Sequence, residues 1–157
     1  MKIQLWTIGK GHESYVKEGI EDFTKRISKY YPVEWKIIAA AKQNVNSVEN
    51  DIKKIEAQTV MQGLQKDDYL VLLDETGKQF DSPQLASFIE TRTNSSVRQL
   101  IFLIGGAFGV SAEIKDRANF TWSFSRLVFP HQLVRLMLAE QLYRACTIIR
   151  NEKYHHQ

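Results

Sequence analysis

The chain has 157 residues, 43% of them hydrophobic and 25% charged, with a formal net charge of +3. This balance is typical of a folded globular protein and excludes a disordered chain, and the length favours one domain with its own core. No apolar run approaches the roughly 20 residues that cross a bilayer, and no signal peptide is evident. We therefore expect a cytoplasmic protein without a membrane segment. The one cysteine excludes an internal disulfide.

The first half of the chain alternates between strand-like and helix-like segments. Strands are expected at residues 2–8 and 33–39, where apolar residues alternate with polar ones. Apolar residues at helical spacing predict a helix within residues 13–30. A second helix is expected from Ser47, as its N-cap, to about Leu64.

The second half continues the alternation. Residues 69–73 form a continuous apolar run, as in a strand buried on both faces, and residues 74–78 are expected to be the loop after it. Ser82 is a candidate N-cap for a helix that reaches about Arg92, with Pro83 at its first helical position.

Two further strand–helix units complete the chain. Strands are expected at residues 100–104 and 120–124, and helices at residues 112–117, with Ser111 as N-cap, and from residue 131 to 149. Strands and helices that alternate in this way predict an α/β domain with a mostly parallel sheet.

Unusual loops follow three of the predicted strands, after Leu73, Ile104 and Phe124. In open α/β sheets, ligands bind beyond the carboxyl ends of the strands, so we expect these loops to meet at one pocket. Gly105 and Gly106 would let a ligand approach bare backbone N–H groups. An ordinary strand-to-helix turn gives the same pattern, so the glycines alone do not establish a site.

Several common sites are absent from the sequence. It contains no G-x-x-x-x-G-K-[ST] phosphate loop, no G-x-G-x-x-G dinucleotide fingerprint and no G-x-S-x-G nucleophile elbow. No His and Cys residues have zinc-site spacing, so we expect no metal. Five Lys or Arg against two Glu follow Thr121, which suits a phosphate-bearing partner, although a solvated basic face would look the same.

Four motifs, taken in order, resemble those of a known family. They are LLDETGK at 72–78, GGAFG at 105–109, FPHQLVR at 129–135 and AEQLYRA at 139–145, followed by a terminal Tyr-His pair. With the opening strand, the similarity covers the whole chain. The sequence resembles the RlmH family, the 23S ribosomal RNA pseudouridine N3-methyltransferases of the SPOUT class.

The resemblance implies a single-domain SPOUT fold over residues 1–157. It also implies that a C-terminal trefoil knot, at about residues 69–157, binds S-adenosylmethionine. No periodicity argument predicts such a knot. The positions that match the family's cofactor-binding segments are Leu73, Gly105, Gly106, Phe124, Ser125, Arg126, Leu127, Val128 and Phe129. Ala107 and Phe108 depart from the proline and acidic residue that relatives often carry there, so no carboxylate role is expected at this loop.

Methylation at N3 requires loss of the N3 proton, which a positioned base could remove. The candidate catalytic residues are His131, Arg135, Glu140, Tyr154 and His155. Arg135 shares a helix face with His131 and could hold a phosphate or polarise a base carbonyl. Glu140 and Arg144 could instead form an intrahelical ion pair, and the Tyr-His tail could be a frayed terminus.

The resemblance implies a homodimer whose partner subunit helps to complete the site. Surplus apolar surface on the C-terminal helix agrees with such an interface. The implied substrate is 23S ribosomal RNA in the assembled ribosome. Two alternatives stay open: a SPOUT enzyme that acts on another RNA, such as tRNA, and a ribosome-binding protein of this fold without enzymatic activity.

Overall fold

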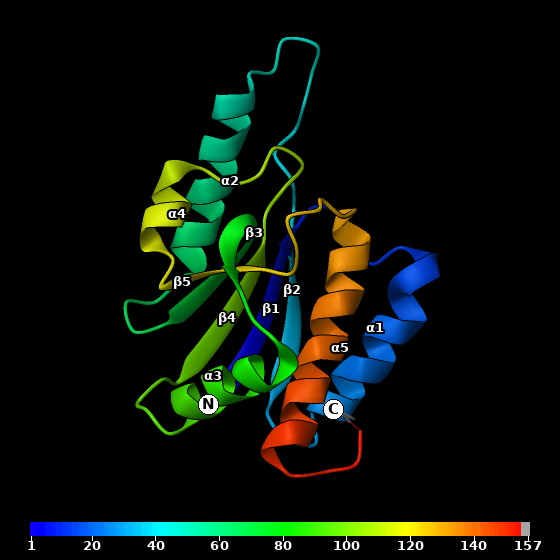
Figure 1. The fold of residues 1–157 in the computed structure, drawn as a ribbon. Coiled ribbons are helices and arrows are strands. Elements are labelled where there is room, and N and C mark those ends of the chain that lie inside the picture. Colours follow the sequence, from blue (N-terminus) through cyan, green and yellow to red (C-terminus); the bar gives the residue numbers. More distant parts are fainter. Residues whose placement is uncertain (155–157) are drawn as a thin grey trace.

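The computed structural model describes residues 1–154, in which strands and helices alternate along the chain (Figure 1). The strands are β1 (Lys2–Ile8), β2 (Val33–Ile38), β3 (Tyr69–Gln79), β4 (Gln99–Ile104) and β5 (Phe120–Ser123). The helices are α1 (Ser14–Ile27), α2 (Glu49–Gly63), α3 (Ser82–Thr93), α4 (Ala112–Arg117) and α5 (His131–Ile149).

The five described strands form one sheet in the order β2-β1-β4-β3-β5, and all their pairings are parallel. The predicted α/β class is therefore confirmed. Both faces of the sheet are apolar and need to be covered by helices. Successive side chains of β1 point to opposite faces, so Leu5 belongs to the apolar cluster on one face and Trp6 to the cluster on the other.

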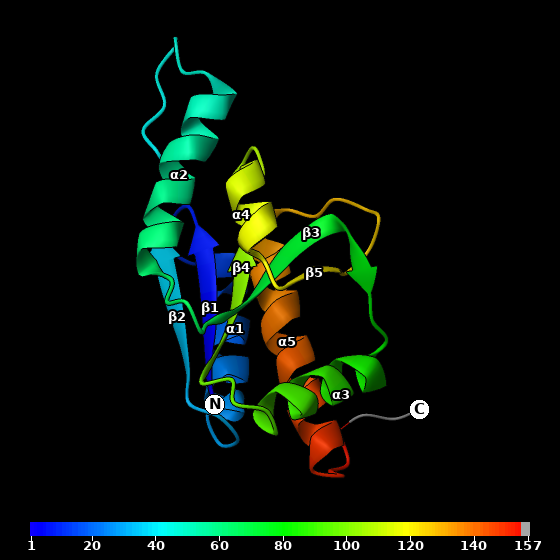
Figure 2. The same ribbon diagram turned by 90° about the vertical axis from the view of Figure 1, so that its left-hand side faces the viewer.

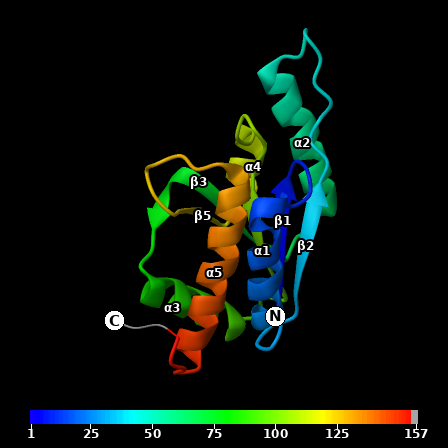
Figure 3. The ribbon, with the colours of Figure 1, turned by 90° about the vertical axis from the view of Figure 1, so that its right-hand side faces the viewer.

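Helices lie on both faces of the sheet. The views in Figures 2 and 3 show α1, α3 and α5 on one face, and α2 with α4 on the other. Because the strands are parallel, their carboxyl ends meet at one edge of the sheet, where the loops that lead into the helices gather. None of the helices within residues 1–154 is long and apolar enough to cross a membrane.

The segment after Leu73 differs from its predicted form. Residues 74–78 are not a plain loop, because β3 continues to Gln79 after an irregularity between Leu73 and Lys78 and pairs again with β5. Gly77 allows this approach, since a Cβ at this position would lie 2.6 Å from the Thr121 carbonyl oxygen. The polar segment becomes a strand through this long-range pairing and not through its own propensity.

Two predicted helix caps are also wrong. The N-cap of α2 is Val48, without a side-chain hydrogen bond, because the Ser47 hydroxyl accepts the Asn44 N–H instead (2.7 Å). The N-cap of α3 is Asp81 and not Ser82, since its carboxylate accepts the backbone N–H three residues on, in a capping box. Ser111 caps α4 as predicted. The trefoil knot stays a prediction from the family resemblance.

Candidate functional site

A cavity of about 480 Å³ lies at the carboxyl edge of the sheet. This volume is within the range of small-molecule sites. The segment of β3 from Leu73 to Glu75 and the loops after β4 and β5 form its walls, together with residues of α2, α4 and the start of α5. The structure thus brings together the three loops that were expected to share a pocket.

Glycine backbone forms one wall of the cavity, at the end of β4. Gly105 and Gly106 are both buried there, and neither has room for a side chain. A Cβ on Gly105 would lie 2.8 Å from Cγ1 of Val110, and a Cβ on Gly106 would lie 2.6 Å from Oε2 of Glu56. A side chain at either position would have to displace the Val110 or Glu56 side chain, whereas glycine leaves the peptide groups of this turn open to the cavity.

Glu56 was not a predicted site residue. Its carboxyl group is only 5% exposed and lies behind Gly106, where Oε1 accepts the Ala41 N–H (3.2 Å). Burial raises the pKa of Glu56 above its ordinary value, and the bond from Ala41 partly opposes this. Its sequence position on a helix, far from the glycines, gave no signal of this contact.

The segment between β5 and α5 forms the opposite wall. Five of its six predicted cofactor residues line the cavity, namely Phe124, Ser125, Leu127, Val128 and Phe129. Arg126 does not line it and is exposed. Two hydrogen bonds of serine hydroxyls fix the backbone of this segment. The Ser123 hydroxyl donates to the Ser125 carbonyl oxygen (2.8 Å), and the Ser125 hydroxyl accepts the Leu127 N–H (3.0 Å). Leu73, which precedes the irregularity in β3, also lines the cavity.

Charged side chains at the cavity come from the segment after Leu73, which was expected there, and from α2, which was not. Asp74 and Glu75 follow Leu73, and Glu49 pairs with Lys53 on α2 (3.2 Å). Lys115 lines the cavity as well, so its walls carry three acidic and two basic side chains. The Asp74 and Glu75 positions, directly after a strand, were visible in the sequence, whereas the approach of α2 depends on the order of the strands.

His131 begins α5 and lines the cavity. Burial lowers its pKa below the ordinary value of 6.5, and the positive charge of Arg135 lowers it further. The imidazole is therefore neutral at neutral pH and able to accept a proton. Of the candidate catalytic residues within the described chain, His131 is the one at the cavity.

Arg135 points away from the cavity towards the loop before α1. Its side chain is buried, and Nη1 donates to the Lys10 carbonyl oxygen (2.8 Å) and to Nδ1 of His12 (3.4 Å). Burial lowers the pKa of the guanidinium. Its predicted contact with a phosphate or a base carbonyl is thus not made from the cavity wall.

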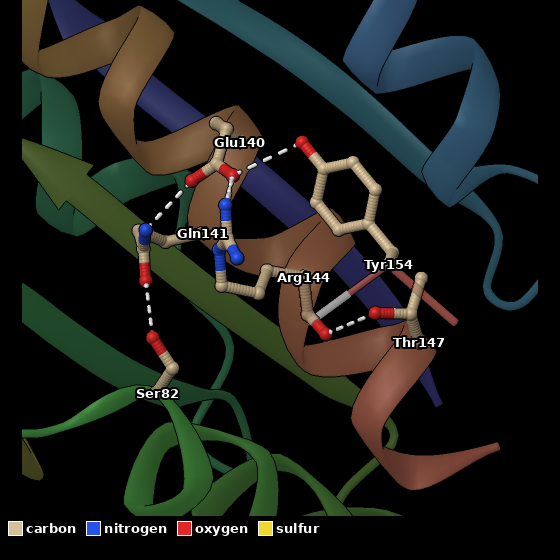
Figure 4. Close-up of polar contacts among 6 residues, drawn as sticks. All are labelled: Ser82, Glu140, Gln141, Arg144, Thr147 and Tyr154. Carbon is tan, nitrogen blue, oxygen red and sulfur yellow. Dashed lines mark hydrogen bonds and ion pairs between the residues drawn. The ribbon is translucent and has the colours of Figure 1, made fainter. Parts of the chain in front are cut away.

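Glu140, at the middle of α5, and Tyr154, beyond the end of the helix, are joined by a hydrogen bond (Figure 4). Glu140 accepts hydrogen bonds from Arg144 Nε (3.0 Å), the Gln141 amide (2.6 Å) and the Tyr154 hydroxyl (3.2 Å). The ion pair expected as the alternative role of Glu140 is present. Burial, followed by the Glu140 charge, raises the pKa of Tyr154.

This network is remote from the cavity of the same chain. Glu140 lies nine residues after His131, which is roughly 14 Å along a helix at 1.5 Å per residue. The structure therefore does not bring the candidate catalytic residues into one place within a chain. His155 lies outside the described residues. Within residues 1–154, no three His, Cys, Asp or Glu side chains gather as a metal site requires.

Comparisons with known proteins agree with this architecture. A family model described as "Predicted SPOUT methyltransferase" matches residues 1–155. Proteins named "Ribosomal RNA large subunit methyltransferase H" are 47% identical in Cytophaga hutchinsonii, over 99% of this chain and 100% of the relative, and 42% identical in Christiangramia forsetii, over 100% of both. A solved structure of a probable methylase family protein from Haemophilus influenzae has a TM-score of 0.51 at 8% identity, covering 99% of this chain and 70% of that one, which shows the fold alone. The chain therefore belongs to the SPOUT methyltransferase family.

Proposed function

We propose that this protein transfers a methyl group from S-adenosylmethionine to N3 of a pseudouridine in 23S ribosomal RNA. The observation that carries the proposal is the full-length match to proteins named for large-subunit ribosomal RNA methylation, at up to 47% identity among those compared. A ligand-sized cavity at the carboxyl edge of the sheet supports it. As a ribosomal RNA enzyme, the protein acts in the cytoplasm.

The residues around the cavity fit S-adenosylmethionine. Apolar side chains such as Leu73, Phe124 and Val134 suit the adenine ring, and the peptide groups of Gly105 and Gly106 suit the ribose and methionine portions. The cofactor carries cationic ammonium and sulfonium groups, which the nearby carboxylates Asp74 and Glu75 would attract. When bound, it supplies an electrophilic methyl group; the chain has to orient the acceptor and exclude water.

His131 is the proposed base for the N3 proton. It is neutral at neutral pH, lies at the cavity wall and is fixed at the start of a long helix. A base with a pKa near or below the working pH accepts a proton without first having to lose one. The positive charge of Arg135, one helix turn away, also lowers the pKa of His131 and so keeps the imidazole unprotonated before the substrate binds.

The proposed active unit is a homodimer. Tyr154 is hydrogen-bonded to Glu140, nine residues along α5 from His131 and outside the cavity lining, so we infer that the cavity of one chain would receive Tyr154 and the residues after it from a second copy. Leu127 and Val128, which are 69% and 81% exposed beside the cavity, offer apolar surface that a second copy would cover. Sedimentation should therefore show a dimer at assay concentrations.

The test is methyl transfer from labelled S-adenosylmethionine to ribosomes from a strain that lacks the enzyme. Intact ribosomes, isolated large subunits, bare ribosomal RNA and tRNA are compared, and mass spectrometry locates the methylated nucleotide. We expect label on a large-subunit pseudouridine, strongest with assembled ribosomes, because the fold carries no added RNA-binding unit within its described residues. Label on tRNA alone would replace the proposed substrate, and cofactor binding without label on any RNA would refute the proposed activity.

A further inference from the structure

The loop of residues 9–13, between β1 and α1, is fixed beside the cavity by the first turn of α5. The Gln132 side chain holds two points of this loop: its oxygen accepts the Glu13 N–H (3.0 Å), and its amide nitrogen donates to the Gly11 carbonyl (3.1 Å). The preceding residue, His131, lines the cavity. The position of the 9–13 loop is therefore coupled to the wall at which the proposed base stands.

Arg135 brings a buried positive charge to the same loop. The residue is only 1% exposed, and among residues 1–154 no carboxylate lies within ion-pair distance of its guanidinium. Its Nε is buried without a hydrogen-bond partner. The Glu13 charge, in the same loop, offsets part of the cost of burying this cation. Without an ion-paired carboxylate the cation is still costly to bury, and an anion that reaches it relieves that cost.

Two glycines in the loop add no side chain of their own near this charge. Gly9 has φ +140°, and a Cβ at this position would lie 3.5 Å from Nη2 of Arg135, so the Gly9 backbone lies close to this nitrogen. At Gly11, no atom lies within 4 Å of the position of a Cβ. Between them, the exposed Lys10 adds a second positive charge. A group with negatively charged oxygens fits this arrangement.

An aromatic groove adjoins the charged loop. It has a volume of about 310 Å³ and is lined by the rings of His12 and Trp35, by Ile20, and by polar side chains that include one acidic and one basic group, Glu21 and Lys25. Arg135 can only donate, so Nδ1 of His12 accepts its hydrogen bond, and the ring packs edge-on against Trp35 with centroids 4.8 Å apart. The Trp35 indole donates to the Thr24 hydroxyl (2.9 Å), which fixes the ring. An aromatic surface next to an anion site favours a nucleotide over a free anion.

We propose that the 9–13 loop binds a backbone phosphate of the substrate RNA, through Arg135 and Lys10, with a neighbouring base against Trp35. The inference rests on the proposed RNA methyltransferase function and adds to it a docking surface separate from the cofactor cavity. Anchoring the RNA here positions the target nucleotide relative to His131, because Gln132 and Arg135 belong to the same helix turns.

The test compares Gly11→Asp with Gly11→Asn, two side chains of nearly equal size that differ in charge. Both fit, because the space around a Cβ at Gly11 is open. We expect Gly11→Asp to raise the KM for ribosomes about tenfold over Gly11→Asn, and to reduce the salt slope of binding by about one. Cofactor affinity and kcat should be the same in the two variants. A second pair, Lys10→Glu against Lys66→Glu, an exposed lysine before β3, should show the same contrast.

Equal KM values within both pairs would overturn the proposed docking site. The proposed function would still stand if the wild type methylates the RNA. A defect with intact ribosomes but normal filter binding of protein-free large-subunit RNA would assign the 9–13 loop to a protein partner and also overturn it. Failure of the wild type to methylate any RNA would instead refute the function itself. Thermal unfolding of each variant shows whether a loss of binding reflects a loss of fold.

Discussion

Replacement of Gly77 by alanine tests the close approach of β3 and β5 that frames one side of the cavity. The added Cβ would lie 2.6 Å from the Thr121 carbonyl oxygen and 2.8 Å from the Trp122 carbonyl carbon, both backbone atoms that no rotamer change can move. Restoring van der Waals contact requires the strands to separate by about 1 Å. This breaks the pairings of Lys78 and Gln79 with β5, at about 1 kcal/mol per hydrogen bond, and adds strain of about 1–3 kcal/mol.

We therefore expect Gly77→Ala to lower the free energy of unfolding by about 3–5 kcal/mol and the Tm by roughly 10 °C. Urea unfolding at 25 °C measures the first quantity and calorimetry the second. The matched control is Gly11→Ala, where a Cβ meets nothing within 4 Å, and its change should stay within about 0.5 kcal/mol, or be slightly stabilising. A Gly77→Ala protein within about 1 kcal/mol of the wild type would refute the reasoning.

Three further changes test the site. Because burial holds the His131 pKa below its ordinary value, the acid limb of kcat/KM should lie at lower pH than that of an ordinary histidine. His131→Gln should remove this acid limb and lower kcat by about 100-fold or more in a pH–rate profile. The pKa of Glu56 is higher in the folded state than in the unfolded state, so the free energy of unfolding falls as the pH rises from the unfolded-state pKa through the folded-state pKa. Glu56→Gln should therefore raise the Tm at neutral pH and flatten its pH dependence in calorimetry. Tyr154→Phe should leave the Tm nearly unchanged, since Glu140 keeps its bonds from Arg144 and Gln141, yet lower kcat about tenfold or more if the hydroxyl acts at a partner's cavity.

The order and type of the elements could be predicted because each is marked locally. The apolar run of β4 and the helical spacing in α5 depend on residues close in sequence, and the structure confirms both. The extension of β3 could not be predicted in this way. Its residues are polar and include Gly77, and they form a strand only because β5 lies against them, from more than 40 residues away.

The cavity loops could be predicted from a general rule, since ligand sites in parallel sheets lie beyond the strand ends. The contributions of Glu49 and Lys53 could not, because α2 reaches the cavity only through the arrangement of helices over the sheet. The same holds for Arg135, whose i, i+4 spacing to His131 correctly placed the two on neighbouring turns but not on the same cavity. Which way a long side chain points depends on the carbonyl groups it meets.

The most direct measurement of the central claim is photo-crosslinking of labelled S-adenosylmethionine to the protein, followed by peptide mapping. If the cavity binds the cofactor, the label should appear in peptides that contain residues 105–109 or 124–131, and unlabelled cofactor should compete it away. Label on the groove around Trp35, or on the Glu140–Arg144 segment of α5, would contradict the assignment of the cavity and with it the proposed role of His131.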